Sequence, residues 1–260
     1  MPEGPSIVIL KETLQPFAGK KVLKAGGNAK IDMKRMINQK IVRFESHGKH
    51  FLICFKDFYL RIHLLMFGTY RVNERKELAP RLLLEFKKDE FSFYTCSITL
   101  NEGQPEDNYD WKFDLMSPKW SAVKTEKKLK EKKSMNVCDA LLDQEIFAGL
   151  GNIIKNEILF RQRIHPKSTT GALPDKKMKA LVKDAHVYSK LFYEWKKKFE
   201  LKKHWQIHTK KECPRCKIKA KKEYIGKTKR RTFFCDNCQE LYGEEVKRQK
   251  PKPVRKKGKM

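Results

Sequence analysis

LLDQEIFAGLGNIIKNEILF, residues 141–160, contains the pattern that decides the fold. Apolar residues recur at helical spacing on both sides of GLGN, which predicts two helices separated by a tight turn. The first helix starts at a cap, Ser134 or Asn136, and the second opens at Asn152. Their expected apolar residues are Val137, Leu141, Leu142, Ile146 and Phe147 in the first, and Ile154, Ile158 and Leu159 in the second.

Downstream of this pair, residues 174–199 predict a long amphipathic helix that begins at Pro174. Two CxxC pairs follow, separated by eighteen residues, a spacing typical of a zinc ribbon. Four thiolates close a tetrahedral site, so the expected cofactor is one structural Zn²⁺. The predicted ligands are Cys213, Cys216, Cys235 and Cys238.

Upstream, a short helix carries Ile7, Leu10 and Leu14 on one face and ends at Pro16. Six β-type runs follow: KIVRF, HFLICF, FYLRIHLLMF, TYRV, RLLLEF and EFSFYTCSITL. Many short strands without a helix long enough to cross between them predict an antiparallel sandwich or barrel. Residues 125–136 are either a charged connector or a solvated first helix.

The charge balance indicates the class of partner. The chain has 59 Lys plus Arg against 31 Asp plus Glu, a net charge of +28 over 260 residues. This favours nucleic acid first and an anionic membrane second. No apolar run has the length of a membrane span, and a secretory signal is not expected, so we predict an intracellular protein. A bacterial cytoplasm or nucleoid is favoured, and the composition also allows a nucleus.

The opening residues, MPEGPS, allow two interpretations. In one, Pro2 merely suits the first turn of a helix. In the other, removal of the preceding methionine exposes a secondary amine beside the carboxylate of Glu3. Such an amine titrates near ~8, so a fraction is unprotonated and nucleophilic at neutral pH.

The order of these features resembles the formamidopyrimidine-DNA glycosylase and endonuclease VIII family. The resemblance rests on MPEGP, the HGK turn, HLLMFG, residues 141–160 and RTFFCDNCQ, in the same order and at similar spacings. It implies an α+β fold with an N-terminal antiparallel β-sandwich and a leading helix (1–124), a helix-two-turn-helix domain (125–206) and a zinc-ribbon finger (207–243). The resemblance does not extend to residues 244–260, whose polar, proline-broken composition predicts a disordered basic tail.

The resemblance also implies catalytic roles. Pro2 would be the nucleophile, Glu3 the proton-transferring carboxylate and Lys49 a hairpin lysine that contacts phosphate and assists catalysis. Taken alone, Lys49 would be an ordinary surface lysine of a hairpin. One departure is Ser6, which stands where the family commonly has a second glutamate, and this puts one hydrogen bond near the lesion sugar in doubt.

Further residues correspond to DNA contacts of the family. Met66 would fill the hole left by an extruded nucleotide, and Leu65 and Phe67 would help to wedge the bases, whereas Leu64 is expected in the core. His63 corresponds to a phosphate-binding histidine, although a structural role also fits. Asn152 and Arg230 would hold the backbone beside the lesion, with Arg231 as the alternative to Arg230.

Together these features predict a base-excision repair glycosylase with abasic-site lyase activity, acting as a monomer on damaged double-stranded DNA. The resemblance implies that oxidised pyrimidines are the favoured substrates, because purine-specific members of the family carry a longer loop over a flipped purine than the stretch between Phe199 and Cys213 provides. A non-catalytic protein that binds damaged or bent DNA is the main alternative. A zinc-ribbon protein that binds RNA or ribosomes is another, but it leaves MPEGP unexplained.

Overall fold

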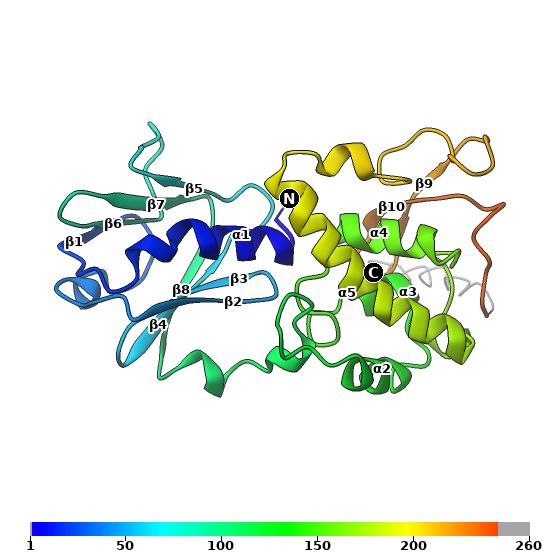
Figure 1. Ribbon diagram of the computed structural model, residues 1–260, viewed down its shortest axis with the longest axis horizontal. Helices are drawn as coiled ribbons and strands as arrows, with labels where there is room; N and C mark the ends of the chain where they lie inside the picture. Colours follow the sequence, from blue (N-terminus) through cyan, green and yellow to red (C-terminus); the bar gives the residue numbers. More distant parts are fainter. Residues whose placement is uncertain (1, 244–260) are drawn as a thin grey trace, which may run out of the picture.

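The computed structural model describes residues 2–243, which form two lobes lying side by side (Figure 1). In the first lobe, two antiparallel sheets enclose an apolar core rich in phenylalanine, and α1 (Gly4–Leu14) packs against β2 and β3. One sheet has the order β2 (Arg43–His47), β3 (His50–Cys54), β4 (Phe58–His63), β8 (Ser97–Glu102). The other has the order β1 (Lys24–Gly26), β6 (Leu82–Glu85), β7 (Glu90–Tyr94), β5 (Thr69–Val72).

Two predicted strand boundaries in this lobe are wrong. The run EFSFYTCSITL is divided at Thr95, whose φ of 52° breaks the extended backbone, so β7 and β8 lie in different sheets. The run FYLRIHLLMF leaves the sheet after His63, and its last four residues form a turn that includes Leu65 with a φ of 54°. The short helix near the start is confirmed, with Ile7, Leu10 and Leu14 fully buried.

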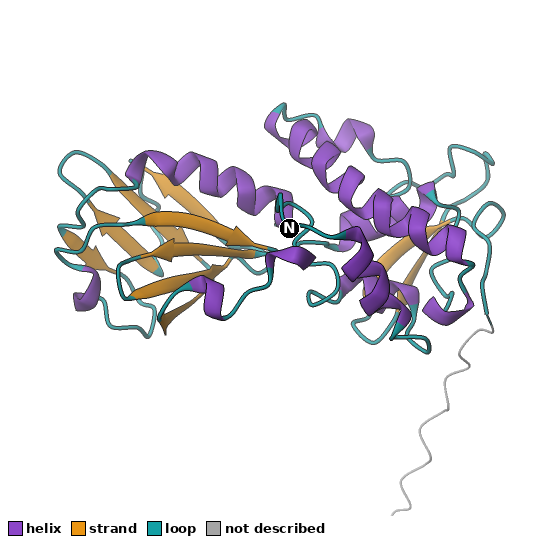
Figure 2. Ribbon diagram, turned by 60° about the horizontal axis from the view of Figure 1, so that its bottom comes forward, coloured by secondary structure: helices purple, strands orange, loops and turns teal. Residues whose placement is uncertain are grey.

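The second lobe is helical, and its long α5 (Asp175–Lys197) packs on the helix that follows GLGN (Figure 2). The other helices are α2 (Ala122–Lys130), α3 (Val137–Leu142) and α4 (Asn152–Arg161). Of the two proposed caps for α3, Asn136 is the one used, since its side chain accepts from the Cys138 N–H. The solvated helix, α2, exists and crosses the predicted boundary at 124/125; the domain limits stay predictions.

The first helix of the pair is shorter than predicted. It ends at Leu142. The Asp143 side chain accepts a hydrogen bond from the Glu145 N–H two residues later, and such a local bond competes with the backbone hydrogen bonds that would continue the helix. Ile146 and Phe147 therefore lie in the loop before α4, although both are fully buried.

The last element of the described residues is a two-stranded hairpin, β9 (Lys221–Ile225) and β10 (Arg230–Phe234), which lies beside α4.

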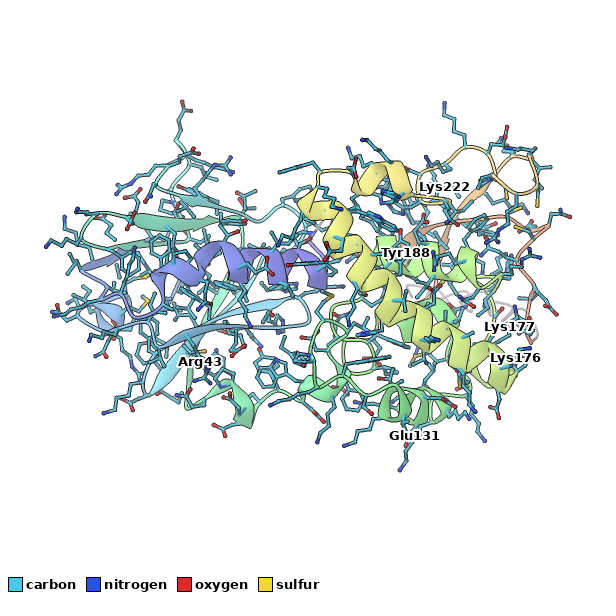
Figure 3. The ribbon with its side chains drawn as sticks, viewed as in Figure 1. Arg43, Glu131, Lys176, Lys177, Tyr188 and Lys222 are labelled. Atoms are coloured by element: carbon cyan, nitrogen blue, oxygen red, sulfur yellow. The ribbon has the colours of Figure 1, made fainter. Side chains whose placement is uncertain are left out.

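Charged side chains such as Lys176 and Lys222 project from this lobe (Figure 3). Among the helices within residues 2–243, none combines the length and apolar composition needed to cross a bilayer. The predicted tail, 244–260, lies outside the described residues. Short 3-10 turns occupy Gln15–Phe17, Lys34–Met36, Pro105–Asp107, Trp111–Phe113, Thr170–Ala172 and Leu201–His204.

Candidate active site

Three glycines from distant parts of the chain meet where the two lobes join. The Gly4 N–H donates to the Gly149 carbonyl at 2.8 Å, and Gly48 lies against the same loop. A Cβ on Gly4 would come within 2.8 Å of the Gly149 Cα, and a Cβ on Gly48 within 2.9 Å of its nitrogen. Gly149 itself has a φ of 95°, which only glycine adopts readily. The absence of side chains thus lets α1, the β2–β3 turn and the GLGN loop touch.

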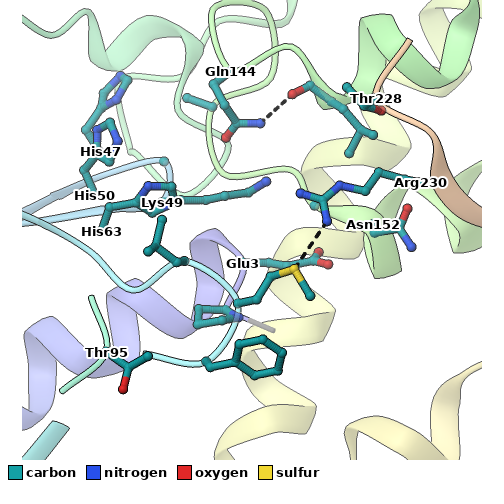
Figure 4. A pocket seen from close by; sticks show the side chains of 18 residues that line it. Glu3, His47, Lys49, His50, His63, Thr95, Gln144, Asn152, Thr228 and Arg230 are labelled. Atoms are coloured by element: carbon teal, nitrogen blue, oxygen red, sulfur yellow. Dashed lines mark hydrogen bonds between the residues drawn. The ribbon is translucent and has the colours of Figure 1, made fainter. Parts of the chain in front are cut away.

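A cavity of about 580 Å³ opens beside this junction (Figure 4). All nine residues expected from the sequence to act in catalysis or DNA contact line it, and Lys49 and Arg230 reach into it from opposite sides. They are Pro2, Glu3, Lys49, His63, Leu65, Met66, Phe67, Asn152 and Arg230. The fold therefore gathers residues from four distant parts of the chain, residues 2–3, 49–67, 152 and 230, around one space.

Glu3 is fully buried at the N-terminus of α4. Its carboxylate accepts from the backbone N–H groups of Ile153 at 2.7 Å and Ile154 at 3.3 Å. Burial raises its pKa, while Lys49 and the two N–H groups oppose that rise. Gly151 makes room for the side chain, because a Cβ there would lie 2.3 Å from the Glu3 Cδ. The site therefore contains a carboxyl group that holds its proton to a higher pH than an exposed glutamate.

Lys49 follows Gly48 in the turn between β2 and β3. Burial lowers its pKa, and the nearby Glu3 carboxylate opposes that change. The buried carboxylate of Asp114 holds the turn by accepting from the Gly48 N–H at 3.1 Å. A second bond, from the Met116 N–H at 2.9 Å, fixes Asp114 itself. Asp114 thus fixes the turn that carries Lys49, whose side chain reaches into the cavity that Glu3 also lines (Figure 4).

An exposed apolar loop forms another wall of the cavity. Leu65, Met66 and Phe67 are 49%, 47% and 74% exposed, whereas Leu64 is buried as expected. The loop closes tightly at Gly68, where a Cβ would lie 2.2 Å from the Leu64 carbonyl oxygen. Across the cavity, the Arg230 Nη1 lies 3.6 Å from the Met66 sulfur (Figure 4).

Helix α4 holds the hairpin that carries Arg230. The Asn152 amide donates to the Arg231 carbonyl at 2.8 Å, and the buried Lys155 ammonium donates to the Thr232 hydroxyl at 2.7 Å. That hydroxyl donates in turn to the Arg230 carbonyl at 3.1 Å. The backbone of Arg230 is therefore fixed through polar groups of α4.

The sequence matches two family models, one for each lobe. Residues 1–97 match the formamidopyrimidine-DNA glycosylase N-terminal domain, and residues 114–189 match the formamidopyrimidine-DNA glycosylase H2TH domain. The chain belongs to the formamidopyrimidine-DNA glycosylase and endonuclease VIII family. The resemblance drawn from the sequence is thereby confirmed.

Relatives of this family member include Endonuclease 8-like 3 of Mus musculus, 34% identical over 204 residues, which cover 75% of the chain and 34% of the relative. Endonuclease 8-like 2 of Bos taurus is 32% identical over 212 residues, covering 74% and 62% respectively. The chain thus spans only about a third of the length of Endonuclease 8-like 3.

Solved structures confirm the predicted α+β fold class. A viral DNA glycosylase superposes with a TM-score of 0.80 at 21% identity, covering 91% of this chain and 99% of that one. The formamidopyrimidine-DNA glycosylase of Lactococcus lactis, bound non-covalently to DNA with an AP site, gives 0.80 at 20% identity with the same coverage. At this identity, the likeness shows the fold.

The four cysteines expected to bind a metal lie together in the second lobe of this family member. Their sulfur atoms all fall within 4.8 Å of one another, and those of Cys213 and Cys238 are 3.8 Å apart. A tetrahedron with metal–sulfur bonds of about 2.3 Å has edges of about 3.8 Å, so this donor set fits a closed tetrahedral ion. The cluster, Cys213, Cys216, Cys235 and Cys238, could therefore hold one metal ion.

Several cavity residues were missed by the sequence reasoning, among them His47, His50 and Gln144. The Gln144 side chain accepts from the Gly149 N–H at 3.1 Å and donates to the carbonyls of Leu142 and Leu150 at 2.8 and 3.0 Å. It therefore braces the GLGN loop. The HGK turn could have revealed the two histidines, since residues flanking a tight hairpin turn lie opposite one another.

Proposed function

We propose that this family member is a bifunctional DNA glycosylase and abasic-site lyase that removes oxidised bases during base-excision repair. The observation that supports this best is the meeting of Pro2, Glu3 and Lys49 in one cavity at the glycine junction. A protein that only binds DNA needs neither a proline amine nor a buried carboxyl group facing an anionic ligand. Such a carboxyl group would weaken binding unless it took part in the chemistry.

The reaction begins at the proline nitrogen. Once the preceding methionine is removed, the amine of Pro2 attacks C1′ of the damaged nucleotide, the C1′–N bond breaks, and the base leaves with a proton. The sugar ring opens and an iminium ion links Pro2 to C1′. This cation acidifies the C2′ proton, whose removal expels the 3′ phosphate. A second elimination expels the 5′ phosphate.

Glu3 is the group that transfers protons in these steps. Because burial raises its pKa, Glu3 holds its proton to a higher pH than an exposed glutamate and can protonate the sugar oxygen as the ring opens. Lys49 lies close enough to oppose that rise in pKa, and its ammonium can bind the phosphate of the same nucleotide. The pair therefore combines an acid with a phosphate contact.

The target base has to leave the helix before Pro2 can reach C1′. Met66 is the side chain that would fill the gap, with Leu65 and Phe67 wedging the neighbouring bases. Their exposure supports this role, because an exposed patch of apolar side chains is typical of an interaction site. His63, Asn152 and Arg230 would bind the backbone of the bent strand together with Lys49.

The metal in the four-cysteine cluster is Zn²⁺ in this proposal. It would tie the two CxxC turns together and leave no open position for chemistry. The hairpin that presents Arg230 depends on this cluster at one end and on α4 at the other. We further propose that the enzyme acts as a monomer on damaged double-stranded DNA, in whichever compartment holds that DNA.

Oxidised pyrimidines are the proposed preferred substrates. Only a short stretch, which includes the turn Leu201–His204, joins α5 to the cysteine cluster, so little chain is available to cover a flipped purine. Saturated pyrimidines stack poorly and leave the duplex at lower cost. Single-turnover excision from matched duplexes should be faster for thymine glycol and dihydrouracil than for 8-oxoguanine. The reverse order would refute this preference and leave the proline chemistry intact.

Borohydride trapping tests the activity itself. Reduction of the iminium ion should leave the full chain covalently attached to abasic DNA. The alternative, a non-catalytic protein that binds damaged DNA, predicts a shifted complex without a covalent product. Replacement of Pro2 by glycine keeps a free amine and should retain weak trapping, whereas an acetylated N-terminus should abolish it.

A further inference from the structure

The turn at the tip of the β9–β10 hairpin, residues 226–229, forms part of the cavity wall. Thr228 lines the cavity together with Arg230, the first residue of β10 (Figure 4). The turn closes through a backbone bond from the Lys229 N–H to the Gly226 carbonyl at 3.3 Å. The N–H groups of its two central residues bond outside the hairpin, to a side chain of α3.

Asp139, in the first turn of α3, is the residue that accepts these bonds. Both of its carboxylate oxygens lie 2.9 Å from the Lys227 nitrogen, and Oδ1 also lies 3.5 Å from the Thr228 nitrogen. Gly226 allows this approach, because a Cβ there would lie 2.4 Å from the Asp139 Oδ1. Successive backbone N–H groups in a turn bind an anion well, and here the anion is a carboxylate of the same chain.

The hairpin is therefore anchored on both sides of Arg230. On the C-terminal side, α4 bonds the Arg231 carbonyl and the Thr232 hydroxyl. On the N-terminal side, Asp139 bonds the turn two and three residues before the arginine. Ile225, which pairs with Arg230 in the hairpin, is buried in the core of the helical lobe. Loss of the Asp139 anchor would leave the turn held only through the strands.

Helix α3 also connects Asp139 to another wall of the cavity. The helix starts at Asn136, whose side chain accepts from the Cys138 N–H at 2.9 Å, and it ends at Leu142. Leu142 and Gln144 line the cavity, and Gln144 braces the GLGN loop. One short helix thus contacts the hairpin turn near its start and leads into the GLGN loop at its end.

We propose that Asp139 is a positioning residue for DNA binding: it holds the turn 226–229 against α3 and so sets the place of Thr228 and Arg230 in the cavity. The inference rests on the proposed action on DNA. It predicts a sign opposite to that of simple electrostatics. A carboxylate near bound phosphates repels them, so its removal should tighten binding if charge alone mattered. Removal of an anchor should weaken binding instead.

The test measures binding without catalysis. The full chain is titrated at several salt concentrations with a duplex that carries a tetrahydrofuran abasic analogue. In Asp139→Ala the dissociation constant should rise roughly tenfold, the effect of losing a hydrogen bond to a charged group. The slope of log affinity against log salt should fall in magnitude by up to about one, because Arg230 no longer releases its counterion fully.

Asp175→Ala is the matched control. Asp175 also lies in the first turn of a helix of this lobe, α5, where it pairs with Lys130 at 3.0 Å. Its replacement removes the same charge and the same favourable interaction with a helix N-terminus. The dissociation constant of this variant should stay within about twofold of the unmodified chain or fall.

A double-mutant cycle tests whether Asp139 acts through the arginine. In the Asp139→Ala background, Arg230→Ala should cost much less affinity than in the unmodified chain, because the arginine is already misplaced. Asp139→Asn keeps one oxygen that can accept from the turn, so it should recover most of the affinity. In single-turnover excision, the protein concentration that gives the half-maximal rate should rise in Asp139→Ala, while the saturated rate stays within about twofold.

Unchanged or tighter binding by a folded Asp139→Ala would overturn the proposal, as would an equal Arg230→Ala loss in both backgrounds. Circular dichroism checks the fold of each variant. If Asp139→Ala does not fold, Gly226→Ala disrupts the same contact from the hairpin side and should weaken binding likewise; unchanged binding there would overturn the proposal. Borohydride trapping reports the activity separately: its failure in the unmodified chain, with these binding changes intact, would refute the enzymatic function alone.

Discussion

Replacement of Gly151 by alanine should slow base excision while the protein stays folded. Gly151 is the N-cap of α4, with φ −122° and ψ −168°, which alanine adopts without strain. The added Cβ would lie 2.3 Å from the Glu3 Cδ, 2.4 Å from its Cγ and 2.5 Å from its Oε1. Because ordinary contacts begin near 3.4 Å, the carboxylate has to move by 3.4 − 2.3 = 1.1 Å.

The expected losses of stability and of excision rate depend on how the Glu3 carboxylate can move. Glu3 has no exposed surface, so it moves by stretching its bonds to the Ile153 and Ile154 N–H groups or by displacing α4. Such overpacking costs about 1–3 kcal/mol of stability. Misplacing the proton donor by about 1 Å costs roughly 100-fold in rate, and complete loss of acid catalysis up to about 10⁴-fold.

The assay compares Gly151→Ala with Gly26→Ala, a matched substitution at a glycine whose added Cβ would meet no atom within 4 Å. Single-turnover excision of dihydrouracil should fall by about 100-fold or more in the first variant and stay within about twofold in the second. Trapping on a preformed abasic site should fall less, since its aldehyde needs no acid to release a base. Glu3→Gln, which adds no volume, should reproduce the split.

Excision by Gly151→Ala at the rate of Gly26→Ala would refute this reasoning. Guanidinium unfolding provides the check on folding: a stability loss above about 3 kcal/mol would show that α4 had moved rather than Glu3. In that case the Glu3→Gln result alone decides whether the carboxyl group takes part.

Three further outcomes are expected. Extra residues retained ahead of Pro2 should abolish trapping and leave DNA affinity within about twofold; an equal cutting rate in the tagged chain would point to another nucleophile, with Lys49 next. Arg230→Ala should lower the slope of log affinity against log salt by about one, because one fewer counterion is released, whereas Arg231→Ala should not; the opposite pattern would exchange their roles. Elemental analysis should find about one zinc per chain, and Cys235→Ser should lose the metal together with DNA cutting; a metal-free active preparation would contradict the structural role.

Local sequence patterns predicted the parts of this fold that depend on residues close together in the sequence. Helical spacing located α4 and α5, and two CxxC pairs located the cysteine cluster, because both features are set by residues a few positions apart. The same logic failed where a single residue overrides the pattern. Thr95 separates β7 from β8, and the Asp143 turn ends α3 early, yet neither residue differs in type from many that continue such elements.

The site depended on longer-range geometry. The family resemblance brought Pro2, Lys49 and Asn152 into one proposal, but no local pattern indicates that the chain is bare of side chains where their segments touch. Three histidines that line the cavity, His47, His50 and His63, likewise lie on neighbouring strands because of the register of β2, β3 and β4. A sequence shows three separated histidines, and only the paired strands make them neighbours.

The residues that build this site and the residues that would act on DNA depend on different physical terms. Gly4, Gly48 and Gly149 let their backbones approach because they lack a Cβ, so each position is intolerant of a side chain. Met66 and Phe67 lie outside the core on a turn that closes at Gly68. Their side chains could therefore enter a DNA duplex without disturbing the packing of the protein core. Polar groups of α4 fix the position of the hairpin that carries Arg230. A buried donor such as Lys155 has to be hydrogen-bonded, and its acceptor is the Thr232 hydroxyl of that hairpin. Under the proposed function, a tightly packed junction with a protruding apolar loop suits the bending of a duplex, since the protein would have to keep its shape while the DNA changes.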